Sequence, residues 1–143
     1  MKRLLAPLCL LACCSLALAA DPAALAPAKN WVMPLFSKQG FRSMTLRGSE
    51  ARANAENELK VANLNLTVFS GDAASRVETV LLSPAATFLP KQNQAHGEKG
   101  VRLIRDDLEA AGTRWTYDHG QKKVSLHDRV RIVFNTEIKD LLK

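Results

Sequence analysis

The chain has 143 residues with a formal net charge of +6, and 47% of its residues are hydrophobic. This length suits a single domain, because two halves would each approach the size at which a core alone struggles to hold a fold. All three cysteines, Cys9, Cys13 and Cys14, lie near the N-terminus, so the rest of the chain has no disulfide, no thiol nucleophile and no cysteine metal site.

Residues 1–19 have the features of an export signal. Lys2 and Arg3 precede an uncharged apolar run at residues 4–18, and residues 17–19 read Ala-Leu-Ala, which fits a signal peptidase site. We therefore expect a Sec-type signal that is cleaved after residue 19, and a periplasmic protein. Two alternatives stay open: lipidation of Cys13 within a loose lipobox, and retention of residues 4–20 as a short inner-membrane anchor.

Cleavage would remove Lys2 and Arg3 and leave a formal charge of +4. Basic and acidic residues are interspersed in the remaining chain, and no stripe of Lys and Arg with interleaved aromatic residues occurs, so we expect no nucleic-acid partner. Residues 20–30 are rich in alanine and proline and are expected to form a flexible leader. Residues 31–143 then form the single domain.

From Trp31 onward the sequence alternates as half-buried strands do. The clearest strand covers residues 59–69, where one face is predicted to carry Ala62, Leu64, Leu66 and Val68. Ser83 and Pro84 are expected to end another strand, because proline cannot donate to a sheet ladder. Further strands are predicted at residues 41–47, 76–82, 86–89, 101–108, 114–117, 124–126 and 130–134.

This pattern predicts an all-β, mostly antiparallel fold. Two segments leave a helix open. Residues 49–59 fit either a helix or a strand with Ala51, Ala53 and Ala55 on one face, and residues 136–142 could form a short C-terminal helix capped by Thr136. Residues 59–69 also resemble residues 123–134, which suggests a duplicated β unit as a hypothesis.

The residues that could support catalysis are scattered. His96, His119 and His127 lack the spacing of metal ligands, and Asp106 and Asp107 would point to opposite faces of a strand. The sequence contains no nucleophile elbow, Ser-x-x-Lys motif or phosphate loop. We therefore expect a protein that is not an enzyme and that uses neither a cofactor nor a metal.

Residues 77–88, 95–105 and 108–126, followed by 130–134, carry a family resemblance. A glycine precedes the Trp115-Thr-Tyr117 strand, a basic turn follows it, and a strand ends in Val-Phe. Over residues 44–134 the chain resembles the LptC and LptA (OstA-like) proteins of lipopolysaccharide export. The resemblance implies an OstA-like β-jellyroll, open along one edge, whose interior holds the acyl chains of lipopolysaccharide.

The resemblance also implies partners. Domains of this kind pair strand to strand with neighbouring jellyroll-type Lpt proteins, and lipid passes along them from an inner-membrane ABC transporter complex toward the outer membrane. An acyl chain of about 12 methylenes costs on the order of 10 kcal/mol to hold in water, so a lipid needs such a shield. The alternative is an envelope scaffold that binds proteins through a sheet edge and carries no lipid.

The candidates for the lipid-binding lining are the apolar residues of the predicted strands: Leu64, Leu66, Val68, Val80, Leu82, Phe88, Leu103, Leu108, Trp115, Leu126, Ile132 and Phe134. Trp115 shares a face with Tyr117, and this pair fits a core contact or a lipid- or sugar-binding contact. The densest basic patch, predicted to meet the phosphates of the head group, consists of Lys122, Lys123, Arg129 and Arg131.

Overall fold

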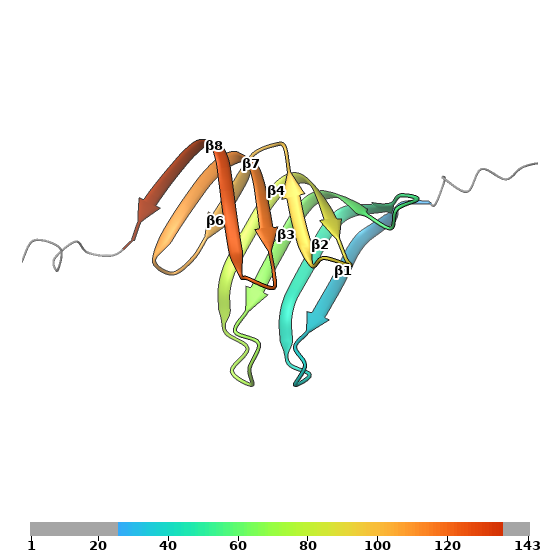
Figure 1. Cartoon of the computed structure of the whole chain (residues 1–143), viewed down its shortest axis with the longest axis horizontal. Helices are drawn as coiled ribbons and strands as arrows, with labels where there is room; N and C mark the ends of the chain where they lie inside the picture. Colours follow the sequence, from blue (N-terminus) through green and yellow to red (C-terminus); the bar gives the residue numbers. More distant parts are fainter. Residues whose placement is uncertain (1–25, 136–143) are drawn as a thin grey trace, which may run out of the picture.

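The computed structural model describes residues 26–135 of the chain (Figure 1). Its strands are β1 (Ala28–Phe36), β2 (Arg42–Ala53), β3 (Leu59–Phe69), β4 (Val77–Leu89), β5 (Gln94–Gly97), β6 (Val101–Ile104), β7 (Leu108–Asp118) and β8 (Lys123–Phe134). All pairings are antiparallel. The prediction of an all-β, mostly antiparallel fold is confirmed.

Residues 26–135 contain no helix, and hence none that could cross a membrane. The predicted signal at residues 1–19 and the predicted helix at residues 136–142 lie outside the described residues. β1 begins at Ala28, inside the segment that was expected to be a flexible leader.

The strands form one sheet with an internal closed circuit of pairings. β1 to β4 pair in chain order. β4 pairs with β6 over residues 80–82 and with β5 over residues 87–89, and β7 also pairs with both short strands. β5 and β6 therefore occupy successive halves of one strand position. In the described part of the chain β1 pairs with β2 alone and β8 with β7 alone, so each has a free edge.

Several strands are longer than predicted. The expected strands at residues 76–82 and 86–89 are two halves of β4, and those at 124–126 and 130–134 are two halves of β8. The prediction that Ser83 and Pro84 end a strand is wrong. The β3–β4 ladder continues on both sides of Pro84 but skips its pairing with Asn63, so the missing N–H of the proline breaks no ladder bond.

Residues 49–53 continue β2, so the strand reading is the correct one for that part of residues 49–59. The remaining residues form the turn into β3. Asn54 organises this turn, because its Oδ1 accepts the backbone N–H groups of Glu56 and Glu58, each at 3.0 Å.

Along the long strands, the alternation of inward- and outward-facing residues shifts by one residue, and it does so at one common level of the sheet. Inward residues normally recur every second position, but at this level the interval is three, so two successive residues face outward. The intervals are Val61 to Leu64 in β3, Ser83 to Ala86 in β4 and Gly112 to Trp115 in β7. We call this level the corner row and define it by Asn30, Ser49, Asn63, Pro84 and Arg114.

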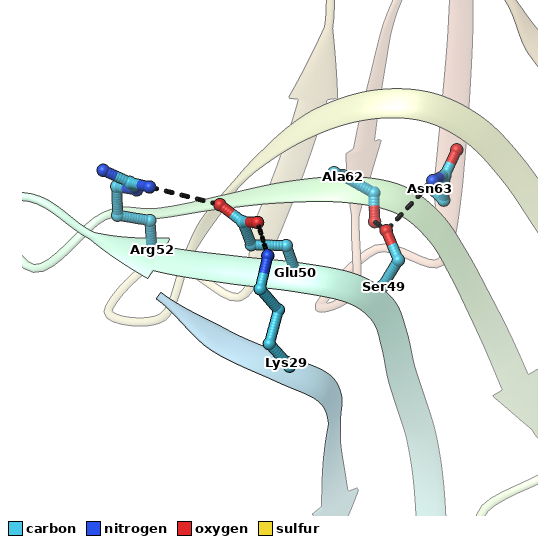
Figure 2. A network of polar contacts seen from close by, with 6 residues as sticks. All are labelled: Lys29, Ser49, Glu50, Arg52, Ala62 and Asn63. Atoms are coloured by element: carbon cyan, nitrogen blue, oxygen red, sulfur yellow. Dashed lines mark hydrogen bonds and ion pairs between the residues drawn. The ribbon is translucent and has the colours of Figure 1, made fainter. Parts of the chain in front are cut away.

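The backbone of the corner row explains the change. Asn30, Asn63 and Arg114 have φ angles of 47°, 50° and 48°, in the left-handed region that bends a strand. Asn63 Nδ2 donates to Ser49 Oγ at 3.0 Å, and Ser49 Oγ donates to the carbonyl oxygen of Ala62 at 3.3 Å (Figure 2). The predicted place of Ala62 beside Leu64 is therefore wrong: at the corner row Val61 faces inward and Ala62 outward.

The sheet folds over itself at the corner row. His119, after β7, contacts Ser43 on β2, although β3, β4 and β5 separate these strands in the sheet. We name the two halves by their residues. The first layer comprises residues 31–36, 42–47, 64–69, 77–83, 101–104, 108–112 and 130–134, and the second comprises 28–30, 49–53, 59–62, 85–89, 94–97, 115–118 and 123–127.

The hydrophobic core lies between these two layers and draws on both. Leu66 and Leu81 of the first layer are 0% exposed, and Phe88 and Trp115 of the second are 1% exposed. Each fully buried side chain of this size contributes roughly 1.5–3 kcal/mol relative to an exposed one. The contact between layers is therefore the main source of stability for the fold.

A line of directly opposed apolar residues crosses the first layer from edge to edge. Opposed residues of paired strands share one face of a sheet. We call this line the apolar row; it consists of Met33, Leu46, Leu66, Leu81, Leu103, Ala110 and Ile132. Its centre is fully buried under the second layer, whereas Ile132 at the β8 edge is 49% exposed. The inward face thus runs out onto an uncovered surface.

Candidate functional site

A cavity lies between the two layers, beside the apolar row. Its volume is about 610 Å³, within the range of small-molecule sites. Both layers contribute to its wall. The lining residues are Val68, Arg76, Val77, Glu78, Thr79, Leu103, Arg105, Asp106, Asp107, Tyr117, Lys122 and Val124.

The floor of this cavity is apolar. Val68 and Leu103 come from the first layer and are 2% and 8% exposed, and Tyr117 and Val124 come from the second layer. Tyr117 is 3% exposed, and burial raises the pKa of its hydroxyl well above the usual range. The tyrosine is therefore neutral, and the floor carries no charge.

The rim of the cavity is charged. Its cations are Arg76, Arg105 and Lys122, and its anions are Glu78, Asp106 and Asp107. Two pairs form within this set: Lys122 Nζ lies 2.9 Å from Glu78 Oε2, and Arg105 Nε lies 3.2 Å from Asp107 Oδ1. An apolar floor with a charged rim suits an amphiphile whose tail enters and whose head stays at the mouth.

Most of the residues predicted as lipid lining share the inward face. Six of them are buried: Leu64, Leu66, Val68, Phe88, Leu103 and Trp115. Leu108 and Leu126 are partly buried and pack against the same cluster. Two of the twelve, Val68 and Leu103, line the cavity itself. The other inward-facing ones fill the core around it or continue the inward face, and Val80 and Leu82 are the exceptions.

Ile132 and Phe134 continue the inward face beyond the covered region. They lie opposite Ala110 and Leu108 of β7 and are 49% and 65% exposed. Together with Leu108 they form what we call the β8 platform. Exposed side chains of this size in one place mark a surface that another molecule covers.

Val80 and Leu82 do not face the cavity. They flank Leu81, which is 0% exposed and belongs to the apolar row. Since successive strand residues point to opposite faces, Val80 and Leu82 belong to the outer face of β4. Alternation along β4 does not by itself decide whether Leu81 or its neighbours Val80 and Leu82 point inward.

The four basic residues predicted to bind phosphate do not come together. Lys122 is the one of them that lines the cavity. Lys123 lies opposite Asp118, Arg131 lies opposite Ala111 on the face away from Ile132, and Arg129 adopts a φ of 50° at the bend of β8. The neighbours of Lys122 at the rim are instead Arg76 and Arg105, which the sequence reading did not single out.

Arg76 and Arg105 were missed because the chain brings them to the rim from distant turns. Arg76 precedes β4, and Arg105 follows β6. No spacing in the sequence connects them. Tyr117 and Val124 carried a signal, since each alternates with a predicted lining residue, Trp115 and Leu126 respectively.

The histidines also lie apart. His96 and His127 flank inward residues and face outward, whereas His119 is half-buried in the turn after β7. Within residues 26–135 no group of His, Cys, Asp and Glu has the geometry of a metal site. His119 instead bonds to Tyr117 and Ser43.

The architecture is a small antiparallel all-β fold, in which a closed circuit of strand pairings surrounds an apolar interior and is flanked by further strands. A family model described as lipopolysaccharide-assembly, LptC-related, matches residues 29–135. This match spans most of the chain, so the protein belongs to the LptC-related family, as the resemblance in the sequence implied. No curated protein matches the chain.

Family membership gives the protein a role in lipopolysaccharide assembly and transport. That process belongs to the cell envelope, and so does this protein. The LptC-related family is a transport family and is generally not enzymatic.

Proposed function

We propose that the protein binds the acyl chains of lipopolysaccharide on its inward face and relays the lipid across the periplasm. The lipid would arrive from the inner-membrane ABC transporter complex and continue toward the outer membrane. The proposed binding regions are the cavity and the β8 platform.

The observation that carries this proposal is the course of the apolar row. It is buried in the centre of the sheet and reaches the surface at Ile132, next to the free edge of β8. Exposed apolar area costs roughly 25 cal/mol per Å². An acyl chain that lies along the platform would remove apolar surface from water on both the platform and the acyl chain, and so would lower both costs.

Head-group contacts would come from the rim. Arg76, Arg105 and Lys122 surround the apolar floor, and Arg and Lys side chains make charge-assisted hydrogen bonds to phosphate. Of the four basic residues predicted from the sequence, Lys122 is the one that we assign to this role.

Partners would bind at the two free edges. Both faces of β8 are apolar near its end: Ile132 and Val133 point to opposite faces and are 49% and 45% exposed. An exposed strand edge with apolar side chains is a template for strand addition. We propose that jellyroll-type proteins of the same pathway pair with β8 and β1, which would continue the inward face from one domain to the next.

The test is photocrosslinking of the full chain to purified lipopolysaccharide. A benzoylphenylalanine is placed at Ile132 or Val124 on the inward face, and at the matched outward positions Val133 or Ser125. We expect lipid adducts at Ile132 and Val124 and few at their neighbours. Ile132 and Val133 have nearly equal exposure, so a difference between them reports the face rather than accessibility.

Equal labelling at inward and outward positions would overturn the proposal. Protein adducts at both β8 positions without any lipid adduct would favour the scaffold alternative, in which the free edge binds proteins and no lipid is carried.

A further inference from the structure

Two polar contacts join the turn between β7 and β8 to strands that pair with neither of them. The first runs from His119 to Ser43, 3.3 Å between Nε2 and Oγ. The second is the ion pair between Lys122 and Glu78. Every other side-chain ion pair among residues 26–135 joins residues of one strand or turn, or of two strands that pair directly. These two contacts are therefore made by the folding of one layer over the other.

The first contact is the middle of a chain of hydrogen bonds. Ser43 Oγ lies 3.2 Å from the carbonyl oxygen of Leu35, which can only accept, so the hydroxyl donates there. It then accepts from Nε2–H of His119. Nδ1 of the same ring carries no proton and accepts from the Tyr117 hydroxyl at 2.8 Å. The donors and acceptors of these three hydrogen bonds are therefore mutually consistent when His119 is neutral.

The second contact lies at the cavity rim. Lys122 is in the turn before β8 and Glu78 is at the start of β4, and both line the cavity. Their side chains are 47% and 42% exposed, so water can replace each partner. Exposed pairs of this kind are weak and open readily.

Both contacts involve the turn after β7, next to Tyr117 of the cavity floor. Tyr117 belongs both to the hydrogen-bond chain and to the floor, and Lys122 and Glu78 belong to the rim. The layers are continuous at the other ends of these half-strands, at the corner row, where the ladder skips pairs such as Asn63 with Pro84. The apolar core holds the layers together between these two sides. A margin that is held by replaceable polar contacts can open locally while the core stays packed.

We propose that Ser43–His119 and Glu78–Lys122 form a clasp that holds the two layers together and controls the access of an acyl chain to the cavity. The inference rests on the proposed function, since it names how that site is regulated. When the clasp breaks, the layers separate beside Tyr117 and the acyl chain can enter the apolar floor. When the clasp forms again, the charged rim closes behind the acyl chain.

The experiment measures how fast a benzoylphenylalanine at Val124 forms an adduct after the full chain is mixed with lipopolysaccharide. The variant Glu78→Gln breaks the ion pair and leaves Lys122, the proposed head-group contact, in place. We expect about a threefold faster adduct in Glu78→Gln, the scale of one exposed ion pair, and the parent rate in Asp106→Asn, which raises the charge of the same rim equally without touching the pair. Ser43→Ala removes the acceptor of His119 and should also accelerate the adduct.

The control is Arg102→Glu. Arg102 pairs with Glu109 at 3.0 Å between neighbouring strands, with similar exposure, and its loss should leave the rate unchanged. Circular dichroism verifies that each variant is folded. A benzoylphenylalanine at Ile132, outside the clasp, reports lipid binding independently and should label equally in all variants.

Glu78→Gln and Asp106→Asn raise the rim charge equally, which separates the clasp from simple attraction of phosphate. Equal acceleration in the two variants would overturn the clasp. Unchanged rates at Val124 with normal labelling at Ile132 would overturn it too and leave the proposed function intact. Absence of adducts at both positions in the parent would overturn the proposed function and the clasp with it.

Discussion

Gly97 and Trp115 lie directly opposite each other on β5 and β7, and the indole ring occupies the space that a side chain at position 97 would need. A Cβ on Gly97 would lie 2.6 Å from Trp115 Nε1 and 2.9 Å from the carbonyl oxygen of Ala85. Trp115 is 1% exposed, so the ring cannot move aside without disturbing the core.

Gly97→Ala should therefore destabilise the fold by about 1–3 kcal/mol through overpacking. The measurement is the urea midpoint of unfolding followed by tryptophan fluorescence. Gly100→Ala is the matched control, because a Cβ there meets nothing within 4 Å. Equal midpoints for the two variants would contradict the packing of Trp115 over Gly97.

The assignment of faces on β4 can be tested with two neighbouring leucines. Leu81 is 0% exposed and lies in the apolar row, whereas Leu82 faces outward. Leu81→Ala should cost about 2–5 kcal/mol of unfolding free energy, because it leaves a cavity in the core. Leu82→Ala should cost clearly less in the same denaturation experiment. A larger loss at Leu82 would reverse the two faces.

The bend at Asn63 predicts an unusual order of substitutions. Asn63 has a φ of 50°, where a β-branched residue is strained by about 1–2 kcal/mol. Asn63→Val should therefore lower the thermal midpoint, although valine is otherwise favoured in strands. Asn63→Gly should stay close to the parent, since glycine adopts this conformation freely. A valine variant more stable than the glycine variant would exclude the left-handed bend.

His119 predicts how stability depends on pH. Its partial burial lowers the pKa of the imidazole, the nearby Lys122 charge lowers it further, and Asp118 opposes the shift. The folded state therefore prefers neutral His119, and its contribution is fully present above pH 6.5, the ordinary value. That contribution is lost as the pH falls through the lower folded pKa, because the unfolded chain binds the proton more tightly.

We expect the urea midpoint of the parent to fall between pH 7 and pH 5 more steeply than that of His119→Gln. His127→Gln is the control, since His127 is exposed on the outer face and its loss should leave the slope unchanged. Parallel pH profiles for the parent and His119→Gln would show that His119 is not buried in its neutral form.

The sequence reading was least accurate at the corner row. It divided β4 at Pro84, where the strand continues, and it divided β8 between residues 126 and 130, next to the bend at Arg129. It also placed Ala62 with Leu64. The division at Pro84 came from the rule that proline cannot donate to a sheet ladder, which does not apply where the ladder skips the proline. The other two errors arise because the inward residues are three apart instead of two where the chain bends, whereas the prediction assumed a period of two.

In the candidate site, too, some features could be predicted from the sequence and others could not. The apolar character of Val68, Leu103 and Trp115 follows from alternation along each strand, and all three face inward. The charged rim does not follow from any local pattern, because Arg76, Arg105 and Lys122 belong to three separate turns. The densest basic patch in the sequence proved to be spread over two faces and a bend.

The sequence by itself determined the all-β class, the antiparallel strands, most of the inward apolar residues and the family, because these depend on local alternation and on short motifs. Only the tertiary structure decided that the sheet folds over at the corner row, which residues meet across the layers, and where the apolar row becomes exposed. These features depend on contacts between residues far apart in the chain, such as Ser43 with His119 and Glu78 with Lys122. No period along the strand encodes them.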